Sequence, residues 1–288
     1  MDNIRYTNAT EASKIYFLPC LMTAGNLFCG FAAIMRCVEA KFTARIEMLD
    51  PLFAASRYSP EQIYEQAIWF ILAAVVFDSL DGRLARLGGH ETLFGLEFDS
   101  LADIVSFGLA PALMVMFLLL SPTQDMPVYR LTGWVISFVY LACAAIRLAR
   151  FNVITNPLLE HDDSLPKTDF LGLPVPAAAG TIASIVMVMN RMPDAYIPVF
   201  SLVLPPVLLG IALLMVSKIH YPSFKKIDWN TRIKVESLLL FIVLAFLIYQ
   251  FHYYAIAFIF ISYLSFGIVR HIWRKISSRP NAAESEID

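Results

Sequence analysis

The chain has 288 residues, of which 58% are hydrophobic and 16% charged, and its formal net charge is −2. A chain of this length is too apolar to be a water-soluble domain, and a near-neutral charge gives no basis for binding nucleic acid. The composition therefore predicts an all-α, polytopic bundle of transmembrane helices.

The predicted membrane-spanning elements are eight apolar runs that are long enough, or nearly so, to cross a hydrocarbon core of about 30 Å. They cover residues 19–37, 60–87, 93–120, 131–151, 174–190, 197–217, 236–250 and 253–273. Neither an internal repeat nor a soluble domain interrupts them, so we predict a single integral-membrane domain over residues 1–288. Within it, 1–18 is expected to be an N-terminal segment and 276–288 a disordered tail.

The charged residues predict the orientation of these runs. With the N-terminus inside, most of the 22 Lys and Arg residues fall in the inner segments, including Arg83 and Arg86. Because Lys and Arg accumulate on the cytoplasmic side, both termini and the turn after residue 87 are predicted to be cytoplasmic.

Two of the runs carry local signals of their own. Thr23, Asn26 and Gly30 in the first run are small or polar residues, which either permit close helix packing or supply polar contacts. Before the second run, Ser59-Pro60-Glu61-Gln62 has the spacing of a capping box and predicts a helix that begins at Pro60.

Four carboxylates interrupt the apolar pattern where the second run ends and the third begins. Asp78 and Asp81 are three residues apart, and Asp99 and Asp103 are four apart, so each pair shares one face of a helix. Two long helices joined by a short turn lie antiparallel, which brings the pairs together. Each carboxylate at membrane depth costs about 2.5 to 3.5 kcal/mol. Two divalent cations with oxygen ligands, Mg²⁺ or Mn²⁺, match the formal charge of the four, and we predict a two-metal site.

The same stretch reads D-x-x-D-G-x-x-A-R, then eight residues, then G-x-x-x-D-x-x-x-D, and it is filled by Asp78, Asp81, Gly82, Ala85, Arg86, Gly95, Asp99 and Asp103. It resembles the signature of the CDP-alcohol phosphotransferases, integral-membrane enzymes that make phospholipids. The resemblance implies a six-helix core, with Asp78, Asp81 and Asp99 as metal ligands. Asp103 would complete the metal site and act as general base.

Around the aspartates, the same resemblance implies contacts to the CDP part of the substrate. Gly82 leaves the helix face beside Asp81 bare, so a base or a pyrophosphate can approach the backbone. Ala85 keeps this wall shallow, and the guanidinium of Arg86 can bind two phosphate oxygens at once. Gly95 opens the second half of the motif and is assigned to the CDP moiety as well.

Outside the motif, four segments are similar to the phosphatidylserine synthases, one family of this superfamily. They are FLPCLMTAGNLFCGF, GLEFDSLADIVSFGLAPA, RLARFN and FLGLPVPAAAG. This likeness implies transfer of a phosphatidyl group from CDP-diacylglycerol to L-serine with release of CMP, in a homodimer in the inner membrane. Asn26 becomes a candidate contact to CDP. Arg147 and Arg150, three apart on one face, either bind the serine carboxylate or a phosphate, or anchor the helix at the interface.

Two alternatives stay open. Another acceptor, such as glycerol 3-phosphate, inositol phosphate or choline, would suit the same motif. A cation-coupled transporter would also hold carboxylates inside the membrane, but it predicts broken or repeated spans, and the sequence shows none. Within the enzyme reading, Ser79 and Ser100 lack an adjacent base in the sequence, which favours direct displacement over a covalent intermediate.

Overall fold

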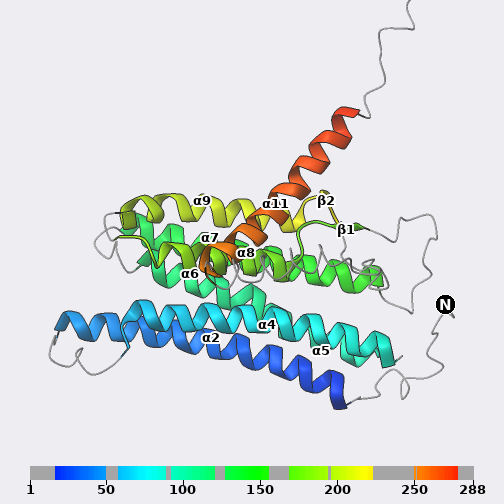
Figure 1. The fold of residues 1–288 in the computed structure, drawn as a ribbon, viewed down its shortest axis with the longest axis horizontal. Helices are drawn as coiled ribbons and strands as arrows, with labels where there is room; N and C mark the ends of the chain where they lie inside the picture. The colour runs from blue at the N-terminus through cyan, green and yellow to red at the C-terminus, as the bar shows by residue number, and fades with distance from the viewer. Residues whose placement is uncertain are drawn as a thin grey trace, which may run out of the picture.

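The computed structural model describes residues 17–49, 58–88, 92–120, 127–155, 169–193, 196–222, 250 and 252–277. The helices are α2 (Phe17–Leu49), α4 (Pro60–Gly88), α5 (Leu93–Asp103), the π-helix η1 (Ile104–Leu109), α6 (Ala110–Leu120), α7 (Pro127–Thr155), α8 (Val175–Met189), α9 (Ile197–Val216) and α11 (His252–Ser277). They form a bundle whose helices run mostly along its long axis (Figure 1). The predicted all-α bundle is confirmed. The described strands, β1 (Asp169–Leu171) and β2 (His220–Pro222), are short and pair antiparallel at one end.

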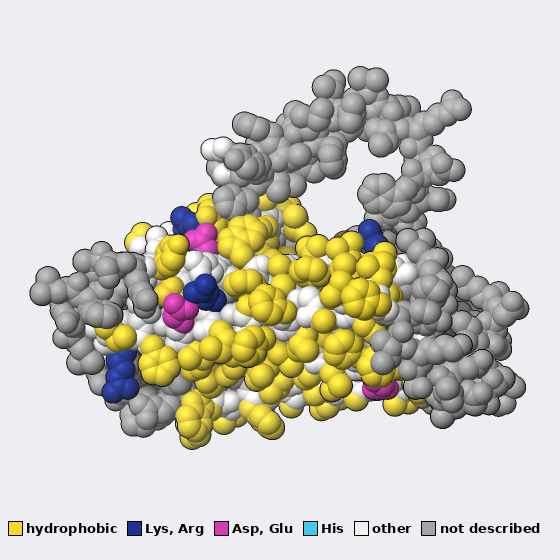
Figure 2. All heavy atoms as spheres, turned by 90° about the horizontal axis from the view of Figure 1, so that it is seen from below, with side chains coloured by type: hydrophobic (Ala, Val, Ile, Leu, Met, Phe, Trp, Pro, Cys, Tyr) yellow, Lys and Arg dark blue, Asp and Glu magenta, His cyan; other side chains and the backbone are white. Residues whose placement is uncertain are grey.

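Five stretches of the described helices are long and apolar enough to cross a membrane: Phe17–Ile46, Pro60–Leu84, Leu93–Leu118, Leu131–Ile154 and Tyr253–Arg274. Val175–Met189 and Leu202–Val216 are shorter apolar helices. Figure 2 shows hydrophobic side chains over most of one face, with the few charged side chains toward its ends. The chain is therefore a multi-pass membrane protein. The predicted run 236–250 lies almost wholly outside the described residues, so the number of eight spans stays a prediction.

Helices α2 and α4 lie side by side along the bundle (Figure 1). Both helices carry small buried residues at helical spacing, with Ala33, Cys37 and Ala40 on α2 and Ala67 and Ala74 on α4. Small side chains let two backbones approach closely in a membrane, where the hydrophobic effect does not drive helices together. The capping box predicted at the start of α4 is present, since the backbone N–H of Ser59 donates to Gln62 Oε1 at 3.1 Å.

The first helix is longer than the predicted run 19–37, because α2 continues to Leu49. The charged residues Glu39, Lys41 and Arg45 end the apolar pattern, but they do not end the helix. Arg36 and Glu39 form an ion pair at 2.6 Å on its exposed face, and a pair three residues apart supports a helix. The apolar run therefore predicted the span correctly, but it placed the C-terminal end of the helix too early.

The third run is one helical unit with a π-helical turn in its middle. Thr92 caps α5, and its side chain accepts a hydrogen bond from the backbone N–H of Gly95 at 3.1 Å. Immediately after Asp103 the backbone widens into η1, and the N–H of Ala110 bonds to the carbonyl of Val105 instead of the residue four positions back. Such turns are rare in proteins, and those that occur are often found at functional sites.

The small sheet closes the end of the bundle at which α8 begins and α9 ends. Phe170 pairs with Tyr221, and the N–H of Gly172 donates to Ile219 O at 2.8 Å. Gly172 has φ +79°, a conformation that L side chains rarely adopt. The buried Tyr221 packs against Gly267 of α11, so the sheet connects α8 and α9 to the last helix.

Candidate active site

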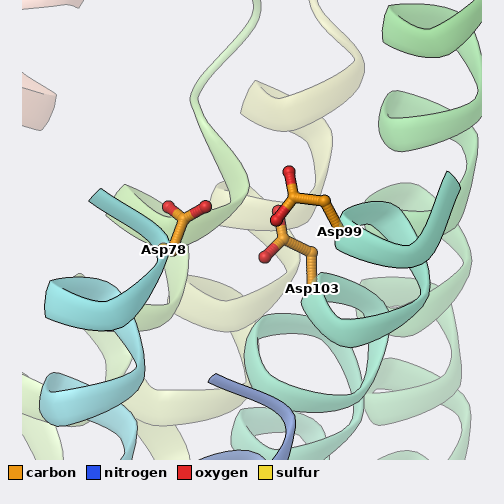
Figure 3. Close-up of side chains that lie close together, drawn as sticks. All are labelled: Asp78, Asp99 and Asp103. Atoms are coloured by element: carbon orange, nitrogen blue, oxygen red, sulfur yellow. The ribbon is translucent and has the colours of Figure 1, made fainter. Parts of the chain in front are cut away.

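Three aspartates meet where the C-terminal half of α4 passes the junction of α5 and η1. Each of Asp78, Asp99 and Asp103 offers a carboxylate oxygen, and these oxygens all lie within 4.8 Å of one another. Figure 3 shows Asp78 reaching across from α4 toward the two side chains of α5. Asp103 is buried, whereas Asp78 and Asp99 are partly exposed. Two antiparallel helices thus bring together groups that are 25 residues apart in the chain, counted from 78 to 103.

The fourth aspartate, Asp81, is not part of this group of three. It is buried one turn further along α4, and its Oδ2 accepts a hydrogen bond from Thr23 Oγ1 of α2 at 3.2 Å. It is still close enough to Asp99 for the two charges to interact. Asp81 therefore lies at the side of the cluster that faces α2.

Helix α2 supplies a second polar contact, to Asp103. Asn26 is fully buried, and its Nδ2 donates to Asp103 Oδ1 at 2.9 Å, while its own Oδ1 has no hydrogen-bond partner within the described chain. The sequence predicted Asn26 as a polar contact to CDP. The structure places it directly on an aspartate, with one amide oxygen available to a further donor.

The remaining predicted residues lie on α4 and α5, which carry the cluster, or on α7. Gly82 is half-buried beside Asp81, and Gly95 is half-buried in the first turn of α5. Arg147 of α7 is buried and lies within electrostatic reach of Asp103 and Asp78, and its Nε has no hydrogen-bond partner in the described structure. Its neighbour Arg150 is half-buried. Ala85 and Arg86 lie in the last turns of α4, and their side chains are outside what the structure describes.

The structure adds contacts that the sequence did not predict. Thr23 donates a hydrogen bond to Asp81. The signal in the sequence was the spacing of three residues between Thr23 and Asn26, which places both on one face of the helix. On the other side, Ser100 Oγ donates to Asn152 Oδ1 at 2.9 Å, and Asn152 Nδ2 donates to Glu97 Oε2 at 3.2 Å. These bonds join α5 to the end of α7, next to Arg147. Glu97 itself is exposed and takes no part in the group of three carboxylates.

The donor set fits a hard divalent cation. Three carboxylates with facing oxygens repel one another in an apolar bundle, and a cation removes that repulsion. Asp99 Oδ1 is buried and has no hydrogen-bond partner within the described residues, so it has a lone pair available to a ligand. All the candidate ligand atoms are oxygens, which suits Mg²⁺ or Mn²⁺ better than zinc or copper.

Comparison with known proteins gives the class. A family model described as CDP-alcohol phosphatidyltransferase matches residues 16–216, a stretch that contains all of the aspartates and both arginines. The chain belongs to this family, whose members are generally dependent on divalent metals. It is therefore an enzyme of CDP-alcohol phosphotransfer.

The names of curated relatives describe a more specific activity than the family does. The chain is 33% identical over 262 residues, 91% of its length and 93% of the relative, to a CDP-diacylglycerol--serine O-phosphatidyltransferase of Helicobacter pylori (strain J99). It is 40% identical over 129 residues, 44% of its length and 39% of the relative, to the enzyme so named from Mycobacterium leprae. It is also 33% identical over 190 residues, 63% of its length and 70% of the relative, to an archaetidylserine synthase of Methanothermobacter thermautotrophicus.

Proposed function

We propose that this protein is a CDP-diacylglycerol--serine O-phosphatidyltransferase, which transfers the phosphatidyl group of CDP-diacylglycerol to the hydroxyl of L-serine and releases CMP. The observation that carries the proposal is the cluster of Asp78, Asp99 and Asp103 inside a bundle of membrane helices. The relatives named for serine as acceptor, one of them along 91% of this chain, support the choice of acceptor.

The four aspartates would hold two divalent ions, Mg²⁺ or Mn²⁺, with Asp103 also acting on the acceptor. When bound, the ions supply positive charge that neutralises the pyrophosphate and stabilises the leaving CMP. Thr23 and Asn26 keep Asp81 and Asp103 in place from α2. The bare backbone at Gly82 and Gly95 gives the CDP moiety access to this wall, and Arg86 is the candidate contact to its phosphates.

Asp103 is the candidate general base. Its Oδ1 already accepts a hydrogen bond from Asn26, so we assign the serine proton to Oδ2. Removing this proton as the hydroxyl attacks phosphorus gives phosphatidylserine and CMP in a single displacement. Ser79 and Ser100 are the serines of the motif. Ser79 Oγ donates to Val75 O, and Ser100 Oγ donates to Leu96 O and Asn152 Oδ1. Neither hydroxyl donates to a base, which supports direct displacement without a covalent intermediate.

Arg147 is the candidate partner for the serine carboxylate. It is buried close to Asp103, which is where an acceptor must lie if Asp103 removes its proton. Arg150 lies one turn further along the same face and would bind the carboxylate or a phosphate. We further place the site on the cytoplasmic side of the inner membrane. The homodimer expected from the family resemblance remains a prediction.

An assay with purified protein, CDP-diacylglycerol and a panel of labelled alcohols tests the acceptor. We expect product from L-serine and none from glycerol 3-phosphate, inositol phosphate or choline. Product from one of the other alcohols instead of serine would move the protein to another branch of the family.

In the same preparation, direct displacement predicts that labelled CMP exchanges into CDP-diacylglycerol only when serine or phosphatidylserine is present. Exchange without either would indicate a phosphatidyl-enzyme.

A further inference from the structure

The π-helical turn η1 begins at the residue after Asp103, and both of its sides are held by neighbouring helices. From α2, the carbonyl of Asn26 accepts a hydrogen bond from Ser106 Oγ at 2.9 Å. From α7, the hydroxyl of the buried Tyr140 donates to Phe107 O, also at 2.9 Å. A π turn changes the register of the helix ladder, and Tyr140 gives one of its carbonyls a partner outside the helix.

Asn26 connects this turn to the candidate base. Its side chain donates to Asp103 Oδ1, and its backbone carbonyl accepts from Ser106, three residues later on the same helical unit. One residue of α2 is thus bonded to two successive points on the path of the third span. Both bonds are buried, and both Asn26 and Ser106 have no exposed surface.

The close approach of the two helices depends on Gly30, four residues after Asn26 on α2. A Cβ at position 30 would lie 2.6 Å from Ser106 Cα, a distance that real Cβ atoms essentially never show. A helix with a side chain at this point would move away from η1, and Ser106 Oγ would no longer reach the carbonyl of Asn26. The pair Asn26 and Gly30 on one helix therefore fits the pair Asp103 and Ser106 on the other.

We propose that Ser106 is a positioning residue for the transfer reaction, fixing Asp103 through Asn26 at the point where η1 begins. Ser106 does not touch the substrate. Its hydrogen bond to the Asn26 carbonyl fixes the position of α2 along the third span. That position determines where the Asn26 amide holds the Asp103 carboxylate. Misplacing a reacting group by about 1 Å can cost on the order of a hundredfold in rate. The inference rests on the proposed function in taking Asp103 as the base and as a ligand of the metal.

The test compares Ser106→Ala, Asn26→Ala and the double variant in the full-length protein. In the wild-type background, Ser106→Ala should lower kcat by about tenfold to a hundredfold and leave the KM of both substrates within about twofold. In the Asn26→Ala background, the same change should alter kcat by less than about twofold, because the amide through which Ser106 acts is already missing. Ser184→Ala is the matched control, since the hydroxyl of that buried serine donates to Thr181 O within α8. It should leave kcat unchanged.

A second readout needs no substrate. Binding of Mn²⁺, followed by electron paramagnetic resonance, should be several-fold weaker in Ser106→Ala than in wild type, and equal in Asn26→Ala and the double variant. Wild type that fails to use serine would reject the proposed acceptor and would leave this comparison intact. If Ser106→Ala does not fold, Ser106→Cys keeps a side chain that can donate at this position, with a weaker donor. Unchanged kcat and Mn²⁺ affinity, an equal loss of kcat in both backgrounds, or a rise in KM alone would overturn the inference.

Discussion

At the scale of single residues, we predict that the aspartate cluster lowers the unfolding temperature without metal and raises it when metal is bound. Without a cation, the carboxylates of Asp78, Asp99 and Asp103 repel one another, so Asp78→Asn should raise the unfolding temperature in EDTA. Adding Mn²⁺ should raise the unfolding temperature of wild type, because a ligand that binds only the folded state stabilises it, and should have little effect on the variant. Activity should be lost in the variant and, in EDTA, in the wild type.

Glu97→Gln is the control for that experiment. Glu97 is an acidic residue on the same helix as Asp99, but it is exposed and bonds to Asn152 instead of joining the cluster. The variant should keep both its stabilisation by Mn²⁺ and its activity. An Asp78→Asn variant that still binds Mn²⁺ as wild type does would show that the three carboxylates are not the metal site.

Arg147 makes a prediction about the acceptor. A charge-assisted hydrogen bond to the serine carboxylate is worth about 1.5 to 3 kcal/mol, and the flat guanidinium can present two donors where Lys presents a point charge. Arg147→Lys should therefore raise the KM for serine about tenfold or more, with little change in the KM for CDP-diacylglycerol. Steady-state kinetics with each substrate varied in turn measure both values.

The control is Arg191→Lys, at the opposite end of α4, where Arg191 binds Glu65 at 2.9 Å. It should not change the serine KM. If Arg147→Lys weakens the binding of CDP-diacylglycerol instead, Arg147 binds a phosphate, and the acceptor carboxylate lies elsewhere.

At the scale of elements, Gly30 is predicted to be essential for the contact between α2 and η1. In Gly30→Ala, the new methyl group would lie 2.6 Å from Ser106 Cα, so the two helices must separate. We expect a loss of about 1 to 3 kcal/mol in the free energy of unfolding. Gly210→Ala is the matched control, because position 210 is exposed within α9 and a Cβ there meets nothing within 4 Å.

The control should be more stable than wild type by about 0.5 to 1 kcal/mol, since Ala is the better helix former. Unfolding in detergent, followed by circular dichroism, measures both variants. Equal stabilities of Gly30→Ala and Gly210→Ala would mean that α2 and η1 are not in close contact.

The same contacts show where the sequence is informative and where it is not. Apolar runs and the Ser59 capping box predicted the starts of α4, α5 and α11 to within a residue or two, because both signals are local. The π turn was not predicted, since Ile104–Leu109 is as apolar as its neighbours and the turn depends on partners in α2 and α7. Strands β1 and β2 were missed because three residues are too few for a pattern, and their pairing is remote in sequence.

The site divides in the same way. The spacing of the aspartates predicted that the two pairs would meet, because helix periodicity and a short turn determine it. The separate position of Asp81 on Thr23 and the bond between Asn26 and Asp103 depend on how α2 packs against α4 and α5. No spacing within one segment contains that information. Thr23 and Asn26 nevertheless share a helix face, and that was the available signal.

At the scale of the whole molecule, the two ends of the bundle differ in chemistry. One end holds the aspartates and the sheet, and the other holds a cluster around Arg191, in the segment after α8. Arg191 bonds to Glu65 of α4 and lies over the ring of Tyr253 of α11, 4.0 Å from the ring centroid. This cluster joins three helices far from the site. It has no metal-ligand geometry, and we assign it to holding α11 against α4 and α8.

The sidedness of these ends can be tested by labelling introduced cysteines. In the predicted orientation, Arg83 on α4, close to the aspartates, is cytoplasmic, and Tyr58, just before the same helix, is on the outer side; both are exposed. In a variant with Cys20, Cys29, Cys37 and Cys143 replaced, all of which are free thiols, Tyr58→Cys should react with a membrane-impermeable maleimide in intact cells. Arg83→Cys should react only after the membrane is permeabilised. The reverse pattern would place the aspartate cluster outside, away from a cytoplasmic supply of CDP-diacylglycerol and serine, and the proposed location of the reaction would be wrong.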